Sequence, residues 1–449
     1  MDLGQALLEV GEGRADESFT LFSRTLDQRW IDQALEATGT ATVRRRKLPA
    51  DYVVWIVIGM GLLRDRSIAE VVRHLDLVLP GVDPPRRQSV TPGAVVQARD
   101  RLGEPPLQRL FTHSADSWAA ASAEQDRWRG LLVFGVDGSR LRIPDTPDND
   151  RAFGRPKSGR GRAGYPQVRI VALMVLRSHL LAALAVGCCT DAEITLAASL
   201  WPKLPDHSLT ILDRGFVSYR LFHQIHTAGT DCHWLTRGKK NLKWRVLQKL
   251  GPHDFLVELP VHKNLRRAHP ELPETLRARL IHYRRRGFRP QTLLTSLLDP
   301  GAFPAAEIIA LYHERWELEI GFDEIKTHTL EREEAHLRSR APERVRQELW
   351  GLAIGYNLVR LEIERVAQRA AVSPRRISYR HTLMLIRNFW VTAWIASPGV
   401  LPKRLEALQH ELALLILPTR RSRRFPRAVK IKMSNYPLKR TPRKGRRVN

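Results

Sequence analysis

The sequence predicts a mixed α/β protein in which a helical region precedes an α/β core, and a second helical region with a basic tail follows it. Apolar residues recur at helical spacing up to about residue 125, whereas short continuous apolar runs, typical of buried strands, begin at Leu131. A long helical pattern then runs from residue 342 to about 370. We therefore divide the 449 residues into an all-helical N-terminal domain (1–125), an α/β domain (126–370) with a β-strand insertion at about 240–300, and a helical C-terminal region with a basic tail (371–449).

Each element follows from a local pattern. Apolar spacing of three and four residues predicts helices at 23–37, 49–63, 67–79 and 93–102, the last of which is capped by Thr91 and Pro92. This last helix carries Gln97, Arg99 and Arg101 and is conceivable as part of a helix-turn-helix motif, although packing helices of a small bundle are the better-supported interpretation. Apolar runs predict strands at 131–139, 139–143, 168–176, 180–187, 208–216 and 233–236, a helix at 192–200, and insertion strands at 254–261, 275–283 and 291–298.

The chain is strongly basic, with 73 Lys and Arg residues against 47 Asp and Glu residues and a net charge of +26. This balance indicates a polyanionic partner, with nucleic acid as the first candidate and an anionic membrane surface as the second. Residues 418–449 hold 13 of the basic residues and no acid, which predicts a binding arm rather than a solvated tail. The longest apolar run, residues 52–63, is too short to span a bilayer, and the N-terminus lacks a signal-peptide pattern, so we expect a cytoplasmic protein with no membrane partner.

Two of the apolar runs end in an aspartate. The run at 131–139 ends in Asp137-Gly138-Ser139, after which we expect the chain to return as a second strand. In the run at 208–216, Asp213 follows the last of the consecutive apolar residues. For either aspartate alone, a turn-forming role is the simpler interpretation. Because strand ends in an open α/β sheet are where functional sites collect, the pair together favours a site.

A third carboxylate lies in the stretch from Tyr312 to Lys326. Tyr312, Arg315, Glu319 and Lys326 follow one another at steps of three, four and seven residues, which places them on one stripe of a helix. Glu317, about 200° round the helix from Glu319, should point away from that stripe. The alternative is an exposed helix with ion pairs, which is the usual explanation for any isolated pair. Gly321 inside the helix indicates a constraint other than helix propensity.

The three carboxylates of Asp137, Asp213 and Glu319 predict a metal site. Like charges held close together raise one another's pKa, and a divalent cation resolves that conflict. Mg²⁺ takes oxygen ligands, and two such ions can activate the attacking oxygen and stabilise the leaving oxygen in phosphoryl transfer. We therefore expect a pair of Mg²⁺ ions held by these three residues, with Mn²⁺ able to substitute.

A glycine-rich basic loop lies between the first predicted strands. Residues 151–164 contain no acid and include Arg155, Lys157, Arg160 and Arg162, which we expect to follow a phosphate backbone. The aspartates just before the loop, Asp145, Asp148 and Asp150, are left out of the predicted site.

Taken together, these motifs resemble those of the DDE-type transposases of the insertion-sequence-four family, and the resemblance covers nearly the whole chain. Residues 45–75 are similar to that family's N-terminal domain. Asp137-Gly138-Ser139 resembles its first catalytic motif, in which Thr or Ser follows Asp-Gly, and the stretch around Asp213 resembles the second. Its Tyr-Arg-Glu-Lys signature is matched at every spacing, and the family's pattern is also met by Tyr356-Asn357 and Phe425-Pro426-Arg427.

The resemblance implies an RNase H-like catalytic core with a β-strand insertion, and metal-dependent cleavage of DNA at the ends of an insertion sequence followed by transfer of the 3′-OH ends into target DNA. It implies that Asp137, Asp213 and Glu319 bind the metal, that Arg315 and Lys326 hold phosphates, and that Tyr312 contacts flanking DNA. The implied partners are double-stranded DNA, as terminal inverted repeats and target, and a second copy of the chain in the DNA complex. The implied location is the prokaryotic cytoplasm, associated with the nucleoid when bound to DNA.

In relatives with a β-strand insertion, a flipped base stacks on a tryptophan while one strand forms a hairpin. Trp234, Trp244 and Trp316 are the candidates here, although core packing is the better interpretation for each taken singly. Two other functions remain open from the sequence. One is a DNA-binding descendant of a transposase that no longer catalyses, and the other is an RNase H-like nuclease that cuts without joining.

Overall fold

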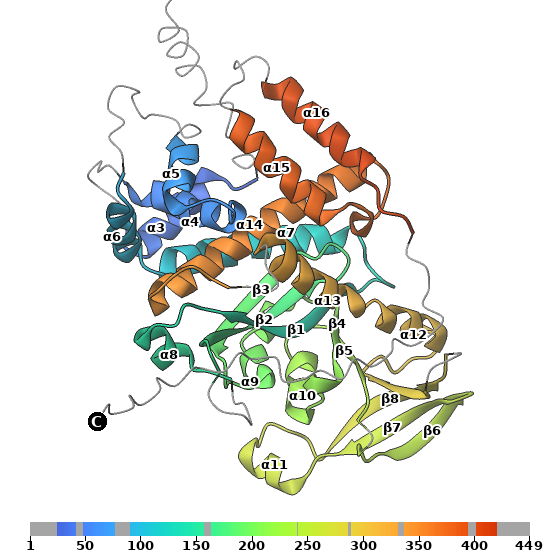
Figure 1. The fold of residues 1–449 in the computed structure, drawn as a ribbon. Coiled ribbons are helices and arrows are strands. Elements are labelled where there is room, and N and C mark those ends of the chain that lie inside the picture. The colour runs from blue at the N-terminus through green and yellow to red at the C-terminus, as the bar shows by residue number, and fades with distance from the viewer. Residues whose placement is uncertain are drawn as a thin grey trace, which may run out of the picture.

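A computed structural model describes residues 25–41, 48–76, 90–156, 163–239, 241–285, 289–330, 336–393 and 401–419 of the chain. A single mixed sheet lies below a body of helices formed from both ends of the sequence, and the insertion extends from one side of the sheet (Figure 1). Within the described part of the chain, no helix combines the length and apolar character needed to cross a membrane.

The sheet has nine strands in the order β3-β2-β1-β4-β5-β9-β8-β7-β6. The first three are paired antiparallel, and β4 and β5 then run parallel to β1. This is the arrangement of an RNase H-like core, which confirms the predicted fold class. The core strands are β1 (Leu132–Arg142), β2 (Gln167–Val175), β3 (Leu181–Cys188), β4 (Ser208–Leu212) and β5 (Cys232–Arg237).

The prediction of a turn after Ser139 is wrong. Strand β1 continues without a break to Arg142, because Gly138 and Ser139 remain paired with Val171 and Ile170 of β2. The chain returns only after α8 (Pro147–Phe153), a short helix in a stretch that the sequence presented as a loop. Asp137 therefore lies inside a strand rather than at its end.

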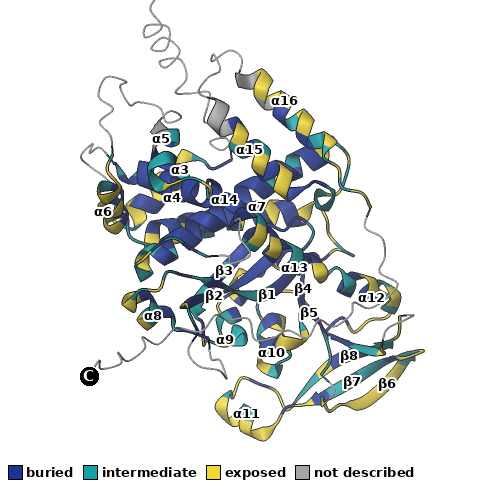
Figure 2. Ribbon diagram, viewed as in Figure 1, coloured by how far each residue is buried: buried dark blue, intermediate teal, exposed yellow. Residues whose placement is uncertain are grey.

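The insertion consists of β6 (Arg245–Gly251), β7 (Asp254–Pro260), α11 (Lys263–Ala268), β8 (Thr275–Tyr283) and β9 (Gln291–Thr295). Strand β9 pairs antiparallel with β5, so the insertion continues the sheet of the core. Strand β6 was missed from the sequence because it is an edge strand whose side chains are mostly exposed and show no burial alternation (Figure 2).

The N-terminal helices are packed into the same body as the sheet. Helix α4 is apolar on every side and almost wholly buried, and it packs along the long helix α14 (Figure 2). Helix α6 begins as predicted, with the Thr91 hydroxyl accepting a hydrogen bond from the Ala94 N–H. These helices are α3 (Gln28–Ala37), α4 (Ala50–Leu62), α5 (Ile68–Asp76), α6 (Pro92–Leu102) and α7 (Pro105–Glu124).

A buried polar cluster joins these helices to α14. The Glu348 carboxylate, fully buried, pairs with Arg64 and accepts hydrogen bonds from the backbone N–H groups of Arg338 and Ser339 at 2.9 Å. Arg99, in the helix with helix-turn-helix character, donates to Gln347 Oε1 at 2.9 Å and is 2% exposed. Arg99 is thus a packing residue and does not face a ligand, whereas Gln97 and Arg101 are exposed.

The remaining helices cover the sheet and complete the helical body. Helix α7 packs on β3, α10 on β5 and α13 on β1, and α14 crosses both α4 and α7 (Figure 1). Their bounds are α9 (Glu193–Ala197), α10 (Tyr219–His226), α12 (Ala305–His313), α13 (Trp316–Asp323), α14 (Pro342–Arg369), α15 (Tyr379–Ala393) and α16 (Leu401–Leu414).

Candidate active site

Two of the predicted carboxylates lie side by side on neighbouring strands. Strands β1 and β4 are parallel, and their last paired positions are Val136 and Leu212. Asp137 is the next residue of β1 and Asp213 directly follows the end of β4, so the register of the sheet places them at the same level. The pairing of β1 with β4 thus brings together two residues that are far apart in the sequence.

Helix α13, which carries Glu319, lies on the same face of the sheet as Asp137. Alternate residues of a strand share a face, so Gly135 and Asp137 face the same way. A side chain at Gly135 would meet Leu318 of α13 within 2.7 Å, which means that the helix lies directly on this position. At Gly321 an added Cβ would meet Met174 of β2 within 2.6 Å. The absence of side chains at Gly135 and Gly321 therefore allows α13 to lie against β1 and β2, which explains a glycine in a helix interior.

The sequence predicts one helix from Tyr312 to Lys326, and this prediction is wrong. The structure divides the stretch into three segments. Helix α12 ends at His313, α13 begins at Trp316, and a π-helical segment (Glu324–Thr329) follows. Because the backbone stays in the right-handed helical region at Glu314 and Arg315, the predicted stripe survives as far as Glu319. The Arg315 Nη2 lies 2.6 Å from Glu319 Oε1. The wider π turn changes the angular phase beyond Asp323, so Lys326 is partly exposed but is not placed by α-helical spacing.

The electrostatics of the site centre on Asp137. Burial raises the pKa of this carboxyl from 3.8 to about 6. The Gly138 N–H and the Arg315 guanidinium lower it, and the negative charges of Asp213 and Glu193 raise it further. Burial also raises the pKa of the Tyr312 phenol to about 12, and Tyr312 is 6% exposed. Asp137, Asp213, Arg315 and Tyr312 thus act on one another's charge, as members of one site would.

These residues suit a hard divalent cation in their chemistry. Three carboxylates supply only oxygen donors. The raised pKa of Asp137 comes first from its burial, and the negative charges of Asp213 and Glu193, which a cation would offset, add to it. In this structure Arg315 provides positive charge between them through its bond with Glu319 and its influence on Asp137 and Asp213. Among the described residues, no group of three or more His, Cys, Asp or Glu side chains is arranged to hold a metal ion.

Arg155 does not have the placement predicted for a DNA contact. Its side chain is 4% exposed and is held by Asp145 and Asp150, two of the aspartates left out of the site, with Arg155 Nε 2.9 Å from Asp150 Oδ1. It also donates to the carbonyls of Ala163 and Gly164. Its role is to tie together the two ends of the basic loop. Lys157, Arg160 and Arg162 lie outside the described residues.

The three candidate tryptophans are in different environments. Trp234 is 2% exposed and stacks on Phe222 with ring centroids 3.9 Å apart, so it has no free face for a base. Trp244, next to β6, and Trp316, at the start of α13, are 39% and 38% exposed. These two remain as candidates for base stacking.

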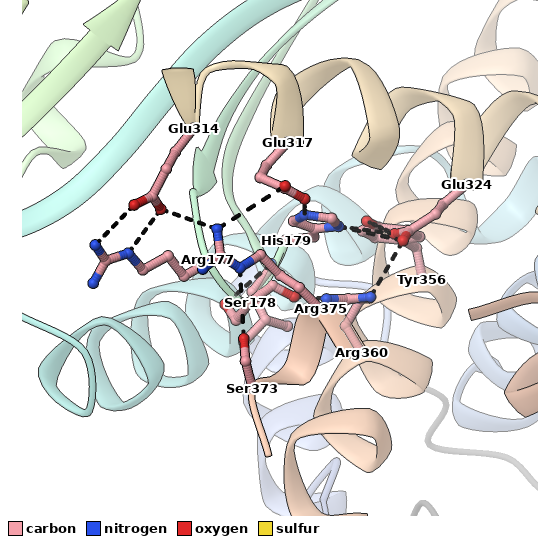
Figure 3. A network of polar contacts seen from close by, with 11 residues as sticks. Arg177, Ser178, His179, Glu314, Glu317, Glu324, Tyr356, Arg360, Ser373 and Arg375 are labelled. Carbon is pink, nitrogen blue, oxygen red and sulfur yellow. Dashed lines mark hydrogen bonds and ion pairs between the residues drawn. The ribbon is translucent and has the colours of Figure 1, made fainter. Parts of the chain in front are cut away.

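The sequence did not reveal a second stripe on the catalytic helix. Glu314, Glu317 and Glu324 point into one buried polar network (Figure 3). The prediction that Glu317 points away from Glu319 fits this placement, but Glu317 is 8% exposed, so it is not a surface residue. The partners of the stripe come from segments far away in the sequence, and only its spacing, i, i+3 and i+10, could have indicated it.

Comparison with known proteins identifies the family. Residues 16–112 match the model described as insertion element 4 transposase N-terminal, and residues 128–358 match the transposase DDE domain. The chain is 38% identical to the transposase InsG for insertion sequence element IS4 of Escherichia coli (strain K12), over the full length of both. It is 34% identical over 232 residues to the putative transposase InsZ of the same organism, covering 51% of this chain and 75% of that one.

Among solved structures, the chain is similar to a piggyBac transposase in a synaptic complex with hairpin DNA, with a TM-score of 0.44 and 12% identity over 90% of this chain and 86% of the other. The two family models cover the N-terminal segment and the α/β domain for which the sequence resembled this family. The match to InsG extends over the whole chain. The protein belongs to the IS4 family of DDE transposases, enzymes that act on DNA and depend on a divalent metal.

Proposed function

We propose that this transposase excises its element by metal-dependent cleavage at terminal inverted repeats and joins the freed 3′-OH ends to target DNA. The observation that carries the proposal is the register of β1 and β4, which sets Asp137 beside Asp213 on the face covered by α13. Phosphoryl transfer on DNA needs carboxylates that hold divalent ions, and the neighbouring carboxylates of Asp137 and Asp213 support the proposal.

Asp137, Asp213 and Glu319 are the proposed metal ligands, for two Mg²⁺ ions that Mn²⁺ can replace. When bound, such ions stabilise charge on the attacking and leaving oxygens. Arg315 and Lys326 are proposed to hold phosphates beside the cleaved bond, with Arg315 turning from Glu319 toward the DNA. Support for this comes from the ion pair of Arg315 with Glu319, a carboxylate whose side chain is 39% exposed. The Tyr312 hydroxyl is proposed to contact flanking DNA.

The N-terminal helices are proposed to read the terminal sequence, and two copies of the chain to hold the two ends in the cytoplasm of a bacterium. Support for the first point comes from α6, where Gln97 and Arg101 are exposed on a helix fixed from behind by Arg99. Because these helices share a core with α14, their role should be tested in the full-length protein.

The direct test is incubation of the full-length protein with its flanking inverted-repeat DNA and Mg²⁺, with cuts and joints mapped by sequencing. We expect cleavage at the element ends, dependent on the metal, and joining of 3′-OH ends to a target plasmid. Cleavage without joining would indicate an RNase H-like nuclease, and binding without cleavage would indicate a non-catalytic descendant. Equal protection of terminal and scrambled duplexes by the protein would contradict end reading by its helical region.

The basic tail gives a separate prediction. Truncation after Leu417 removes residues 418–449 and preserves the backbone bond from Leu417 N–H to Arg376 and the bond from Arg376 Nε to the Leu417 carbonyl. Counterion release predicts a slope of log Kd against log salt proportional to the number of phosphate contacts, so the truncated protein should bind DNA more weakly and with a flatter slope. Fluorescence anisotropy at several salt concentrations measures both. A full-length variant with tail Lys and Arg residues changed to Gln controls for length, and an unchanged slope in either would show that the tail does not contact DNA.

A further inference from the structure

We propose that His179 is a positioning residue for catalysis, which holds the helix that carries Glu319 in its working rotation through Glu317 and Glu324. The inference rests on the proposed role of Glu319 as a metal ligand. His179 lies in the turn between β2 and β3, and its ring is enclosed by α13, the π-helical segment and α14 (Figure 3). The ring lies 1% exposed, on the side of the helix opposite to Glu319.

Both nitrogens of the His179 ring face carboxylates. Nε2 lies 3.1 Å from Glu317 Oε2, and Nδ1 lies 3.3 Å from both oxygens of Glu324. Each ring nitrogen is thus within hydrogen-bonding distance of an acidic side chain. The ring therefore connects two points of the helix that carries Glu319, one in α13 and one in the π-helical segment.

The carboxylates of Glu317 and Glu324 also contact side chains other than His179. Glu324 accepts a hydrogen bond from the Tyr356 hydroxyl at 2.8 Å and pairs with Arg360 at 3.3 Å. Burial alone would raise the pKa of Glu324, but the charges of Arg360 and His179 outweigh it and hold the pKa at about 2. Glu317 Oε1 lies 4.0 Å from Arg375 Nη1, and the same arginine reaches Glu314 at 3.0 Å. Glu314 is held in addition by Arg177, just before His179, at 2.9 Å.

Because α13 is short, its rotation depends on these side-chain contacts. The helix has eight residues and is bounded by a turn and a π-helical segment, so its own hydrogen bonds do little to fix its rotation. Leu318 and Gly321 set its distance from the sheet, and the network behind it resists rotation. A rotation of about 20° would move a carboxylate at the helix surface, about 6 Å from the axis, by roughly 2 Å. Metal coordination tolerates only a few tenths of an ångström, so this rotation would remove Glu319 from the site.

The backbone of His179 suggests the variant that tests this. The residue has φ +65°, a left-handed conformation that asparagine adopts more readily than other residues with a side chain. In His179→Asn the side-chain amide can replace Nδ1 toward Glu324, whereas nothing replaces Nε2 toward Glu317. His179→Gln has the length to reach Glu317 and should retain more of the function. His233→Asn is the matched control, because that ring also joins two polar groups, Asp231 at 2.7 Å and Ser296 at 3.2 Å, but on β5.

The experiment measures Mn²⁺ binding by calorimetry to the full-length protein bound to end DNA, together with cleavage at increasing Mn²⁺ concentration. We expect His179→Asn to weaken Mn²⁺ binding about tenfold or more, as loss of a group that orients a metal ligand does, with DNA affinity unchanged. Saturating Mn²⁺ should restore part of the cleavage rate. Glu317→Gln should give a similar loss, and combining it with His179→Asn should add little, because both remove one contact.

Normal Mn²⁺ binding by His179→Asn, with a fall in thermal midpoint equal to that of His233→Asn, would overturn the proposal and leave His179 a packing residue. Should His179→Asn fail to fold, Glu317→Gln tests the same contact from the helix, and normal Mn²⁺ binding by that variant would equally overturn it. Failure of the wild-type protein to bind Mn²⁺ would contradict the proposed metal site itself, which separates the two hypotheses.

Discussion

Replacing Asp137 with asparagine is expected to abolish DNA cleavage and joining while making the metal-free protein more stable. The substitution keeps the size of the side chain and removes the charge that binds metal, so activity should fall by about three orders of magnitude or more. DNA binding should survive, because the phosphate contacts come from the basic residues and removal of a negative charge favours a polyanion.

The gain in stability follows from the pKa of Asp137. A carboxyl whose pKa is 3.8 in the unfolded chain and about 6 in the folded chain favours folding when protonated. That contribution is complete below pH 3.8 and is lost as the pH rises through about 6. The difference corresponds to roughly 3 kcal/mol at pH 8, which asparagine would recover as an upper bound. Thermal unfolding of the wild type and Asp137→Asn at pH 5 and pH 8, in chelator, measures it, and a gap that fails to widen at pH 8 would contradict the charge assignment.

The other members of the site complete this prediction. Asp213→Asn and Glu319→Gln should lose cleavage and joining equally, whereas Arg315→Ala and Lys326→Ala should retain metal binding and lose part of the cleavage. The control is Glu307→Gln, because that carboxylate is 43% exposed and pairs with Arg129 on the surface. Glu317 cannot serve as a neutral control, since it contacts His179. Near-normal cleavage by Glu319→Gln would show that the helix was assigned the wrong rotation.

Glu348→Ala is expected to cause the largest loss of stability. The carboxylate is completely buried and pairs with Arg64, whose side chain is 5% exposed. It also satisfies two backbone N–H groups and the Ser339 hydroxyl, the last at 2.5 Å. Its removal leaves a buried positive charge and several donors without partners, which costs about 3–5 kcal/mol. We expect a large fall in the thermal midpoint or insoluble protein.

Removing both charges should cost less than removing one. In Arg64→Met/Glu348→Leu no buried charge is left, so the double variant should be more stable than Glu348→Ala. The pKa of Glu348 gives a second measurement. Burial raises this pKa, but Arg64 and the surrounding donors lower it below 4.5. The stabilisation is therefore present above pH 4.5 and is lost on further acidification, and a wild-type protein as acid-sensitive as Glu348→Ala would contradict it.

Motif and spacing were enough to predict Asp137, Asp213, Arg315 and Glu319 as site residues, because each of them belongs to a local pattern. They were not enough to place Asp137 correctly in its strand. Asp-Gly-Ser has a strong turn preference, and only pairing with β2, which begins 25 residues after Arg142, shows that β1 runs through it. Strand pairing is decided by partners that local patterns do not contain.

Buried charge was the other feature that the sequence could not resolve. Glu317 and Glu324 look like surface residues of an amphipathic helix, but they are buried against His179 from the β2–β3 turn and, for Glu324, against Arg360 of α14. Arg155 gives the opposite case. It was assigned to DNA because it lies in a basic loop, yet its partners Asp145 and Asp150 are 10 and 5 residues away, in the sequence already in view.

The packing of α4 against α14 restricts how such a transposase can evolve. The boundary near residue 125 separates segments in sequence, but the apolar surface of α4 is completed by a helix that begins at Pro342. Recombination between two related elements at that boundary would combine parts of two different cores. Arg64 and Arg99 would then meet residues of another chain in place of Glu348 and Gln347. Exchange of the whole N-terminal helical region would therefore disturb a core that it shares with α14. Under the role proposed for these helices, substitutions at exposed positions such as Gln97 and Arg101 would change end recognition and leave that core intact.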